Sequence, residues 1–230
     1  MGQHIISGNP PVTVIVRKSA QARRMTLRVS RLDGRITLTM PEGVPEAQGV
    51  AFAKEKEGWL RKQIANHVTV SKVDFGTSLP VEGRLRVIRP CEGRRVLLED
   101  DALLVPGHRD QVPVKLRTFL KETARRRLVE AAHRYAGRLD RAYSSIVLRD
   151  TRSRWGSCTA EGRLMFSWRL ILAPKDVLDY VAAHEVAHLA HMDHSPAFWR
   201  AVERIYGPYQ TQRDWLRTDG NQLHAYRFED

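Results

Sequence analysis

The sequence contains little that would place the protein among secreted, fibrous or membrane classes. Two cysteines, Cys91 and Cys158, in 230 residues are too few for a disulfide framework and fit a reducing compartment. No apolar run approaches the roughly 18 residues that cross a bilayer. The first ten residues lack the basic and apolar segments of a signal peptide. We therefore expect a folded cytoplasmic protein that does not associate with membranes.

Lysine is also scarce, whereas arginine is abundant. Only eight of the 38 basic residues are lysines, so 30 are arginines, and with 26 acidic residues the net charge is +12. Such an excess attracts polyanions, and salt weakens the attraction. The arginines are spread along the chain, with short clusters such as Arg94-Arg95 and Arg125-Arg126-Arg127, whereas a dedicated binding tail is more concentrated. A solvated surface is the favoured interpretation, and a weak association with nucleic acid or another polyanion is the alternative.

The N-terminal half has the pattern of short strands. Alternating or β-branched runs predict strands at 12–16, 25–29 and 36–39, and Asp33-Gly34 is a turn signal between the last two. Helical spacing of apolar residues predicts one helix over about 50–67, and short strands return over 68–105. We expect a β-rich region with one helix over 1–108.

The C-terminal half begins with a long amphipathic helix over 111–139. Strands are predicted at 145–148 and 164–168, and a further helix begins at Pro174, whose fixed φ suits a first helical position. The pattern predicts an α+β fold in which the long helix connects the β-rich half to a second region over 109–230. The alternative to two separate regions is that they form one continuous domain.

Four of the nine histidines lie between positions 184 and 194. His184 and His188 are four residues apart, so on a helix their imidazoles project from one face and can bind one Zn²⁺. Glu185 follows the first histidine and is rotated about 100° from it around the helix axis. This is the HExxH pattern, in which the glutamate acts as general base toward a water molecule at the zinc.

A catalytic zinc needs a third protein ligand and an open fourth position. We favour His194, which requires the helix to stop after about Ala190 or His191 and the chain to turn back. Ser195-Pro196 supports such a stop, because it reads as the N-cap and first residue of a new helix. His191, if the helix continued, and Glu203, from the next helix, are the alternative ligands.

These motifs carry a resemblance to a known family. His184-Glu185-x-x-His188 followed by His194-Ser195-Pro196-x-Phe198-Trp199, with Arg154-Trp155-Gly156-Ser157-Cys158 before them, resembles the YgjP-like family of zinc-dependent metallopeptidases. The resemblance is strong over about 145–220 and weaker over the N-terminal strands. It implies a zincin-like C-terminal half, one zinc per chain on the three histidines, and Glu185 as general base. SprT-like proteases share the histidine spacing; metzincins do too, but they have glycine at the position of His191.

The resemblance and the motif imply a metallopeptidase that acts on polypeptide. Four residues are candidates for stabilising the oxyanion, namely Tyr206, Tyr209, Arg152 and Arg154. In related peptidases an exposed strand pairs with the extended substrate, and by analogy the hairpin near 164–168 is expected to take this role.

Two other functions remain open. A zinc-dependent nucleotide or phosphoanhydride hydrolase would account for the arginines, but the sequence has no Gly-rich phosphate loop and no second metal cluster. A nucleic-acid-associated module with a structural zinc needs four protein ligands, and Cys158 would have to be the fourth. We interpret Cys158 instead as a small buried apolar residue beside the site.

Overall fold

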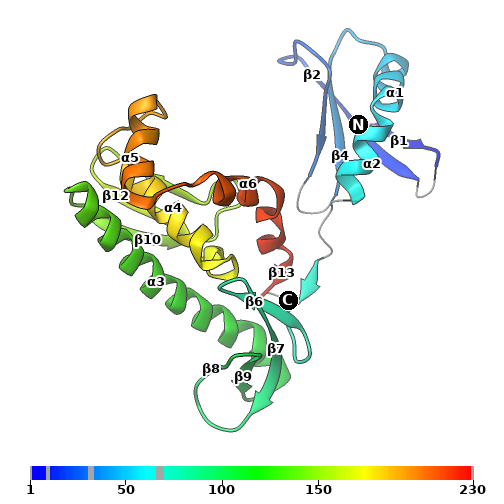
Figure 1. The fold of residues 1–230 in the computed structure, drawn as a ribbon. Helices are drawn as coiled ribbons and strands as arrows, with labels where there is room; N and C mark the ends of the chain where they lie inside the picture. Colours follow the sequence, from blue (N-terminus) through cyan, green and yellow to red (C-terminus); the bar gives the residue numbers. More distant parts are fainter. Residues whose placement is uncertain (1, 9–10, 31–33, 66–69, 229–230) are drawn as a thin grey trace. The chain divides into compact units, whose positions relative to one another are not determined.

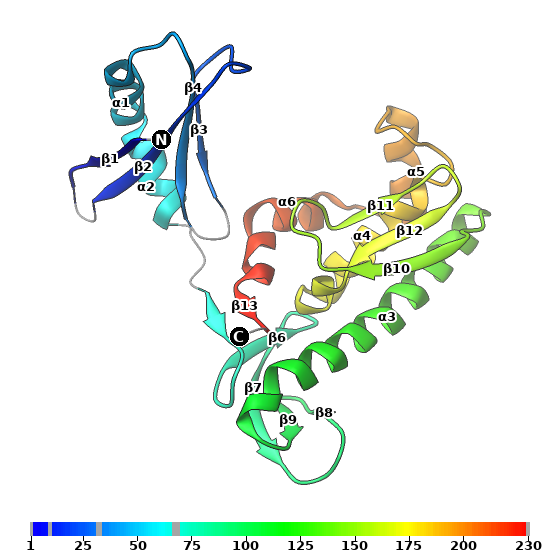
Figure 2. The same ribbon diagram turned by 180° about the vertical axis from the view of Figure 1, so that it is seen from behind.

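A computed structural model describes residues 2–8, 11–30, 34–65 and 70–228 of the chain. The chain divides into two compact units, Met1–Thr69 and Val70–Asp230. Figures 1 and 2 show the elements of both units from opposite sides. Each unit has its own cluster of buried apolar side chains.

The first unit is a four-stranded sheet with two helices on one face (Figure 1). The strands lie in the order β1-β2-β4-β3, and β2 and β4 are parallel whereas the outer pairs are antiparallel. Alternate strand residues such as Val14, Leu38 and Met40 are buried against the helices, as a half-covered sheet requires. The elements are β1 (Gly2–Ile6), β2 (Val12–Ser19), β3 (Thr26–Val29), β4 (Ile36–Pro41), α1 (Glu46–Glu55) and α2 (Glu57–Ala65).

The helical segment of this unit differs from the expectation of one helix over 50–67. It consists of two helices, because Lys56 at the end of α1 has φ −89° and ψ 10°, outside the regular helical range. The antiparallel pair β3 and β4 agrees with the strands expected at 25–29 and 36–39. The Asp33 position of the expected turn lies outside the described residues.

The described part of the second unit contains a four-stranded, a three-stranded and a two-stranded sheet (β5 with β13) and a layer of helices around one core. Its long helix α3 (Val112–Leu139) was expected over 111–139. A three-stranded sheet, in the order β10-β12-β11, packs on α4 (Figure 2), and a four-stranded sheet has the order β6-β7-β9-β8. The remaining bounds are β5 (Ser71–Lys72), β6 (Ser78–Val81), β7 (Arg84–Cys91), β8 (Leu97–Leu98), β9 (Ala102–Pro106), β10 (Ser145–Arg149), β11 (Gly156–Cys158), β12 (Arg163–Ser167), α4 (Lys175–Ala187), α5 (Pro196–Tyr206), α6 (Gln210–Thr218) and β13 (Tyr226–Arg227), with short 3₁₀ turns at Arg109–Gln111, Trp168–Leu172 and Gly220–His224.

The division between the units lies between residues 69 and 70, whereas the sequence pattern placed it at 108/109. The segment 70–108 has the strand pattern of the N-terminal half, but its apolar side chains pack on the C-terminal elements. Leu79, Ile88 and Leu103 belong to the same buried cluster as Leu116 of α3. Strand pattern identifies the class of an element and does not identify the core that buries it.

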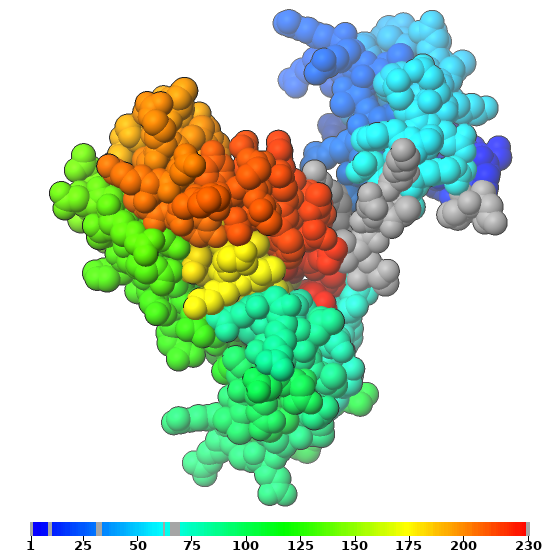
Figure 3. All heavy atoms as spheres, viewed as in Figure 1, coloured from blue at the N-terminus to red at the C-terminus, as the bar shows by residue number. Residues whose placement is uncertain are grey.

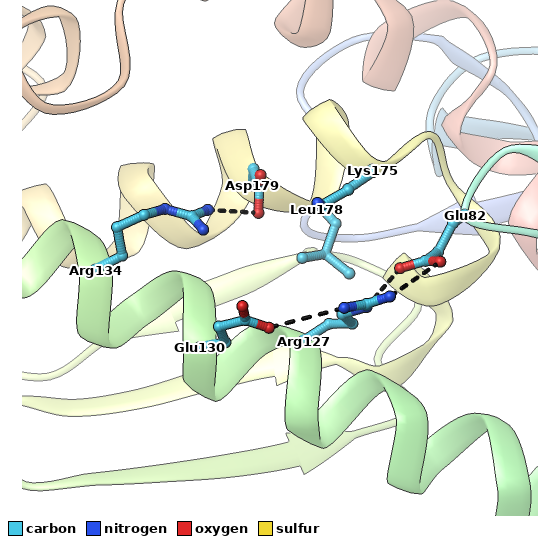
Figure 4. A pocket seen from close by; sticks show the side chains of 7 residues that line it. All are labelled: Glu82, Arg127, Glu130, Arg134, Lys175, Leu178 and Asp179. Atoms are coloured by element: carbon cyan, nitrogen blue, oxygen red, sulfur yellow. Dashed lines mark hydrogen bonds and ion pairs between the residues drawn. The ribbon is translucent and has the colours of Figure 1, made fainter.

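Ion pairs join α3 to its neighbours around a small cavity that is partly open to solvent (Figure 4). Arg127 on α3 donates to Glu82 in the β6–β7 turn at 2.6 Å, and Arg134 lies 3.1 Å from Asp179 on α4. Lys175, Glu130 and Leu178 complete the lining. Because both arginines bind carboxylates of the unit itself, we assign this cavity a structural role. No helix in the described part of the chain is both long and apolar enough to span a membrane.

The position of the boundary is testable with two fragments. We expect residues 70–230 alone to unfold in one cooperative thermal transition, because all of the second core lies within them. Residues 109–230 lack Leu79, Ile88 and Leu103, so part of α3 loses its apolar cover, and this fragment should show no cooperative transition. Circular dichroism of both fragments and of the full chain measures this. A cooperative transition of 109–230 equal to that of 70–230 would restore the boundary at 108/109.

Candidate metal centre

Helix α4 carries the first two histidines from a buried position. Val177, Val181 and Val186 are each at most 3% exposed, and Asp176 lies in the first turn, where a negative charge is favourable. In the space-filling view (Figure 3), α4 (yellow) is visible on this face only between α6 and the strand segments β6 and β7. The helix is therefore held by tertiary packing, which fixes the direction of its side chains.

The helix ends at Ala187, three residues earlier than the sequence indicated. His188 is its C-cap, with φ −65° and ψ −18°, so its backbone is still helical. The spacing of His184 and His188 therefore keeps both rings on one side of the helix. The early end makes the turn that follows longer.

The chain then turns and enters α5. Ser195 is the N-cap of α5 and Pro196 is its first residue, as the sequence predicted. The Ser195 N–H donates to Asp193 Oδ1 at 3.2 Å, which stabilises the turn just before the helix. His194 lies in this turn and faces back toward α4, because its Nε2 is 3.2 Å from the Nε2 of His184.

The three histidines form one group. One ring nitrogen from each of His184, His188 and His194 lies within 4.8 Å of the others. Tetrahedral coordination with metal–nitrogen bonds of about 2.0–2.1 Å places ligand nitrogens about 3.3 Å apart. The separation of 3.2 Å between the His184 and His194 nitrogens fits this geometry. The group can therefore hold a metal ion.

The protonation of the rings also fits metal binding, which needs neutral imidazole. Burial, together with the neighbouring histidines, lowers the pKa of His184 to about 3. Burial also lowers the pKa of His188, and its Nδ1 lies 2.9 Å from the backbone oxygen of His191. A carbonyl only accepts, so Nδ1 carries the proton and Nε2 of His188 has a free lone pair toward the group. The buried Nδ1 of His184 has no hydrogen-bond partner, so the Nε2 atom is the one engaged with its neighbours.

Aromatic side chains hold the imidazoles in place. Phe198 is fully buried, and its ring centroid is 4.4–4.9 Å from those of all three histidines. Trp199 lies beside His184 and His194 at 5.6 and 5.7 Å, and it stacks on Tyr209 at 5.1 Å. Neutral imidazole packs on such rings without the cost of burying a charge.

Glu185 lies beside the histidines and is only 6% exposed. Burial raises its pKa to about 8, and the positive charge of Arg154 opposes this rise. Its carboxylate packs on the backbone of Gly156 in β11: a Cβ added to Gly156 would lie 2.5 Å from the Cγ and Oε1 of Glu185. The edge of the small sheet thus sets the position of this side chain.

The alternative ligands lie outside the group. His191 contributes its backbone oxygen to His188, and Glu203 is exposed on α5. Among the described residues, neither of these side chains nor Cys158 belongs to a group of three possible ligands. Cys158 is half-buried, whereas a buried residue was expected. Burial, together with the charge of Glu185, raises the pKa of its thiol to about 11, so the thiol is protonated and uncharged.

The candidates for the oxyanion stabiliser are two tyrosines that contact neighbouring residues and two arginines that act through their charge. Tyr206 donates its hydroxyl to the backbone oxygen of Asp176 at 2.9 Å, so that proton is already used. Tyr209 stacks between Tyr180 and Trp199. Arg154 acts electrostatically on Glu185, and Arg152 on His224. Arg154 is therefore the candidate whose charge reaches Glu185.

Several residues that shape the site were not found from the sequence. Gly156 belongs to the 154–158 motif, but its close approach to Glu185 depends on a contact between segments that are distant in the sequence. Arg213 on α6 lies over the Trp199 ring at 4.6 Å and helps to lower the pKa of His184. No local pattern marks such an arginine among 30. A signal for the glycine exists, since a glycine within a strand often marks a site where another segment approaches closely.

The fold and this group define the class: an α+β protein whose HExxH helix and third histidine are those of metallopeptidase domains. Residues 23–219 match the sequence model of the YgjP-like metallopeptidase domain, and the chain belongs to the YgjP-like family. No curated protein matches it. The solved metallopeptidase zymogen abylysin of Pyrococcus abyssi is similar, with 18% identity and a TM-score of 0.37, over 40% of this chain and 92% of that chain.

The contact between Gly156 and Glu185 predicts a specific coupling. Gly156→Ala should lower the free energy of unfolding by about 1–3 kcal/mol, because the new methyl group overpacks the carboxylate. In a Glu185→Ala background the same change should cost little, since the clashing atoms are gone. Urea denaturation of the four proteins of this cycle measures the coupling.

Gly137→Ala is the matched control, because Gly137 lies in α3 and a Cβ there meets nothing within 4 Å. It should stabilise the protein by about 0.5–1 kcal/mol. Equal costs of Gly156→Ala in both backgrounds would show that the carboxylate does not rest on this glycine.

His224 predicts an acid-dependent loss of stability. Its ring stacks on Trp155 at 5.2 Å, and burial together with Arg169 lowers its pKa from 6.5 to about 4. Between these pH values the unfolded chain binds a proton that the folded chain does not, so stability falls as the pH falls. His224→Gln should reduce this slope, to which the buried His184 and His188 also contribute, in urea titrations with a chelator present, so that metal release does not contribute. The exposed His133→Gln should follow the native curve; an unchanged slope in His224→Gln would contradict the assignment.

Proposed function

We propose that the protein is a zinc-dependent metallopeptidase that hydrolyses peptide bonds of polypeptide substrates. His184, His188 and His194 are the proposed ligands of one zinc ion per chain, and Glu185 is the proposed general base. The observation that carries the proposal is the convergence of three imidazole nitrogens within 4.8 Å, next to a buried carboxylate on the same helix. Membership of the YgjP-like metallopeptidase family supports it.

The donor set suits zinc in particular. Zinc favours imidazole nitrogen and a tetrahedral arrangement, and catalytic zinc sites use three protein ligands. No further His, Cys, Asp or Glu of the described chain joins the three-histidine group. This leaves a fourth position for water or substrate, in contrast to a structural zinc site, which is closed by four protein ligands.

When bound, zinc lowers the pKa of a coordinated water molecule toward about 7 and polarises a substrate carbonyl. Glu185 accepts a proton from the attacking water as its oxygen bonds to the scissile carbon. Glu185 then delivers that proton to the leaving nitrogen as the carbon–nitrogen bond breaks. The pKa of about 8 describes Glu185 beside uncharged histidines, and a cation held by them favours the ionised carboxylate that can act as a base.

Strand β11 is the proposed partner of an extended substrate. It lies at the edge of the three-stranded sheet, and among described residues its outer edge pairs with no other strand. Its Gly156 contacts Glu185, so a peptide added along this edge runs past the general base. Strand β11 belongs to the hairpin expected for this role, because it pairs antiparallel with β12. Strand β12 itself is the central strand, and its two edges are already paired.

The proposal predicts a selective loss of catalysis. Glu185→Gln should lower kcat on an unstructured polypeptide by at least about 10²-fold, because general acid–base catalysis contributes about 10²–10⁴. Glu203→Gln is the matched control, since it makes the same change in an exposed carboxylate of α5 and should leave kcat unchanged. Release of new amino termini measures kcat.

Metal analysis and a second substrate class complete the experiment. The native protein and Glu185→Gln should each contain about one zinc per chain, and His184→Ala should contain none. Full peptidase activity of zinc-loaded Glu185→Gln would show that Glu185 is not the general base. If the protein hydrolyses nucleoside triphosphates in a Glu185-dependent manner and does not cleave polypeptide, the proposed metallopeptidase function is wrong and the nucleotide hydrolase is the correct alternative.

A further inference from the structure

The basic charge of the chain is not evenly distributed in the first unit. Residues 1–32 contain no aspartate and no glutamate, although they include Arg17, Lys18, Arg23, Arg24 and Arg28. The described acidic residues of this unit include Glu46, Glu55 and Glu57, which lie on α1 and α2. Glu42 lies in the turn after β4, and no described strand of this unit contains an acidic residue.

The sheet has one face that the helices do not cover. In β2 and β4 the residues that alternate with the buried ones are exposed or half-buried, so they lie on this second face. We call it the basic sheet face and define it by six of its residues: Thr13, Arg17, Thr26, Arg28, Thr37 and Thr39.

Strand register brings these side chains into two neighbouring rows. Arg17 of β2 and Thr26 of β3 are both paired with Thr39 of the central β4. Arg28 is paired with Thr37, which lies two residues before Thr39 in β4. With strands about 4.8 Å apart, the two arginines start roughly 12 Å from each other with threonine hydroxyls between them. Arg23 and Arg24 extend the positive charge into the exposed β2–β3 loop.

The arginines of this face are not used inside the protein. Neither Arg17 nor Arg28 makes an ion pair with any residue that the structure describes, and the same is true of Arg23 and Arg24. By contrast, Glu46, Glu55 and Glu57 are each bound to a cation or histidine on the helix side. Both arginines are exposed, so their guanidinium groups are available to an outside anion.

We propose that the basic sheet face binds the phosphate backbone of nucleic acid. Guanidinium groups bind phosphate in a bidentate manner, and threonine hydroxyls donate to phosphate oxygens. The four strands contain no Phe, Tyr or Trp, so the face offers no ring on which a base could stack. Binding is therefore strongly dependent on salt and nearly independent of base sequence.

The test is fluorescence anisotropy of a labelled single-stranded DNA with the full-length chain at about 50 mM salt, where such contacts are strong. Arg17→Ala/Arg28→Ala should raise Kd at least about tenfold and lower the salt slope by about 1.4, which is 0.7 per lost contact. Arg125→Ala/Arg126→Ala removes the same charge from exposed positions of α3 and should change Kd less than about twofold. Arg17→Lys/Arg28→Lys keeps the charge and the salt slope but loses the bidentate contact, so its Kd should lie between those of the native chain and the alanine pair.

Three results would overturn the proposal. They are no binding by the native chain at this salt concentration, equal losses in the alanine pairs of β2/β3 and α3, and equal losses in the alanine and lysine variants. Tighter binding to anionic lipid vesicles or to polyglutamate than to DNA would assign the face to another polyanion. Circular dichroism verifies that the alanine variants remain folded, and the lysine variant supplies the comparison if they do not.

Discussion

The site depends on the return of the chain from the end of α4 to the start of α5. A helix alone brings two imidazoles together, because residues four apart share a face, but it directs the residue six positions further on to another side. The helix ends at Ala187, and Ser195 and Pro196 begin the next one, so that His194 faces His184 across 3.2 Å. The buried ring of Phe198 fills the space under all three histidines. The ligand geometry is therefore a consequence of helix termination and core packing together.

The general base depends on a second, independent contact. Glu185 belongs to α4, but its carboxylate lies against Gly156 on the edge strand of the small sheet. Burial keeps the pKa of this group high until a cation lies nearby, which links the state of the carboxylate to the state of the histidines. A side chain larger than hydrogen at position 156 would occupy the space of the carboxylate. The same strand edge thus positions the base and is available to an extended peptide.

Local patterns predicted the elements well, and distant contacts explain what they missed. The helix over 112–139, the strands around β10 and β12 and the Ser195-Pro196 helix start were all readable, because each depends on periodicity or capping within a few residues. The break at Lys56 and the end of α4 at Ala187 were not, since tertiary packing sets where a helix stops. The unit boundary was misplaced for the same reason: β6, β7 and β9 share one buried core with α3, and no pattern within these strands indicates this. Of the site, spacing indicated the three histidines and Glu185, whereas the roles of Gly156 and Arg213 follow only from the fold.

The excess of arginine, a single feature of composition, separates in the structure into groups with different physical roles. Arg86 is buried and donates to the backbone oxygens of Glu99 and Arg84, and Arg169 binds Asp150 and two backbone oxygens near the C-terminal strand. These arginines satisfy carbonyl groups that loops leave without partners, a task for which a planar group with five N–H donors is suited and lysine is not. The arginines of β2 and β3 have no such partners among the residues that the structure describes, and they face solvent on strands that contain no acidic residue. Arginine therefore serves both to bind carbonyl groups inside the protein and to present charge to solvent, and the net charge alone does not distinguish these two roles. The distinction depends on whether each guanidinium group is already bound within its own unit.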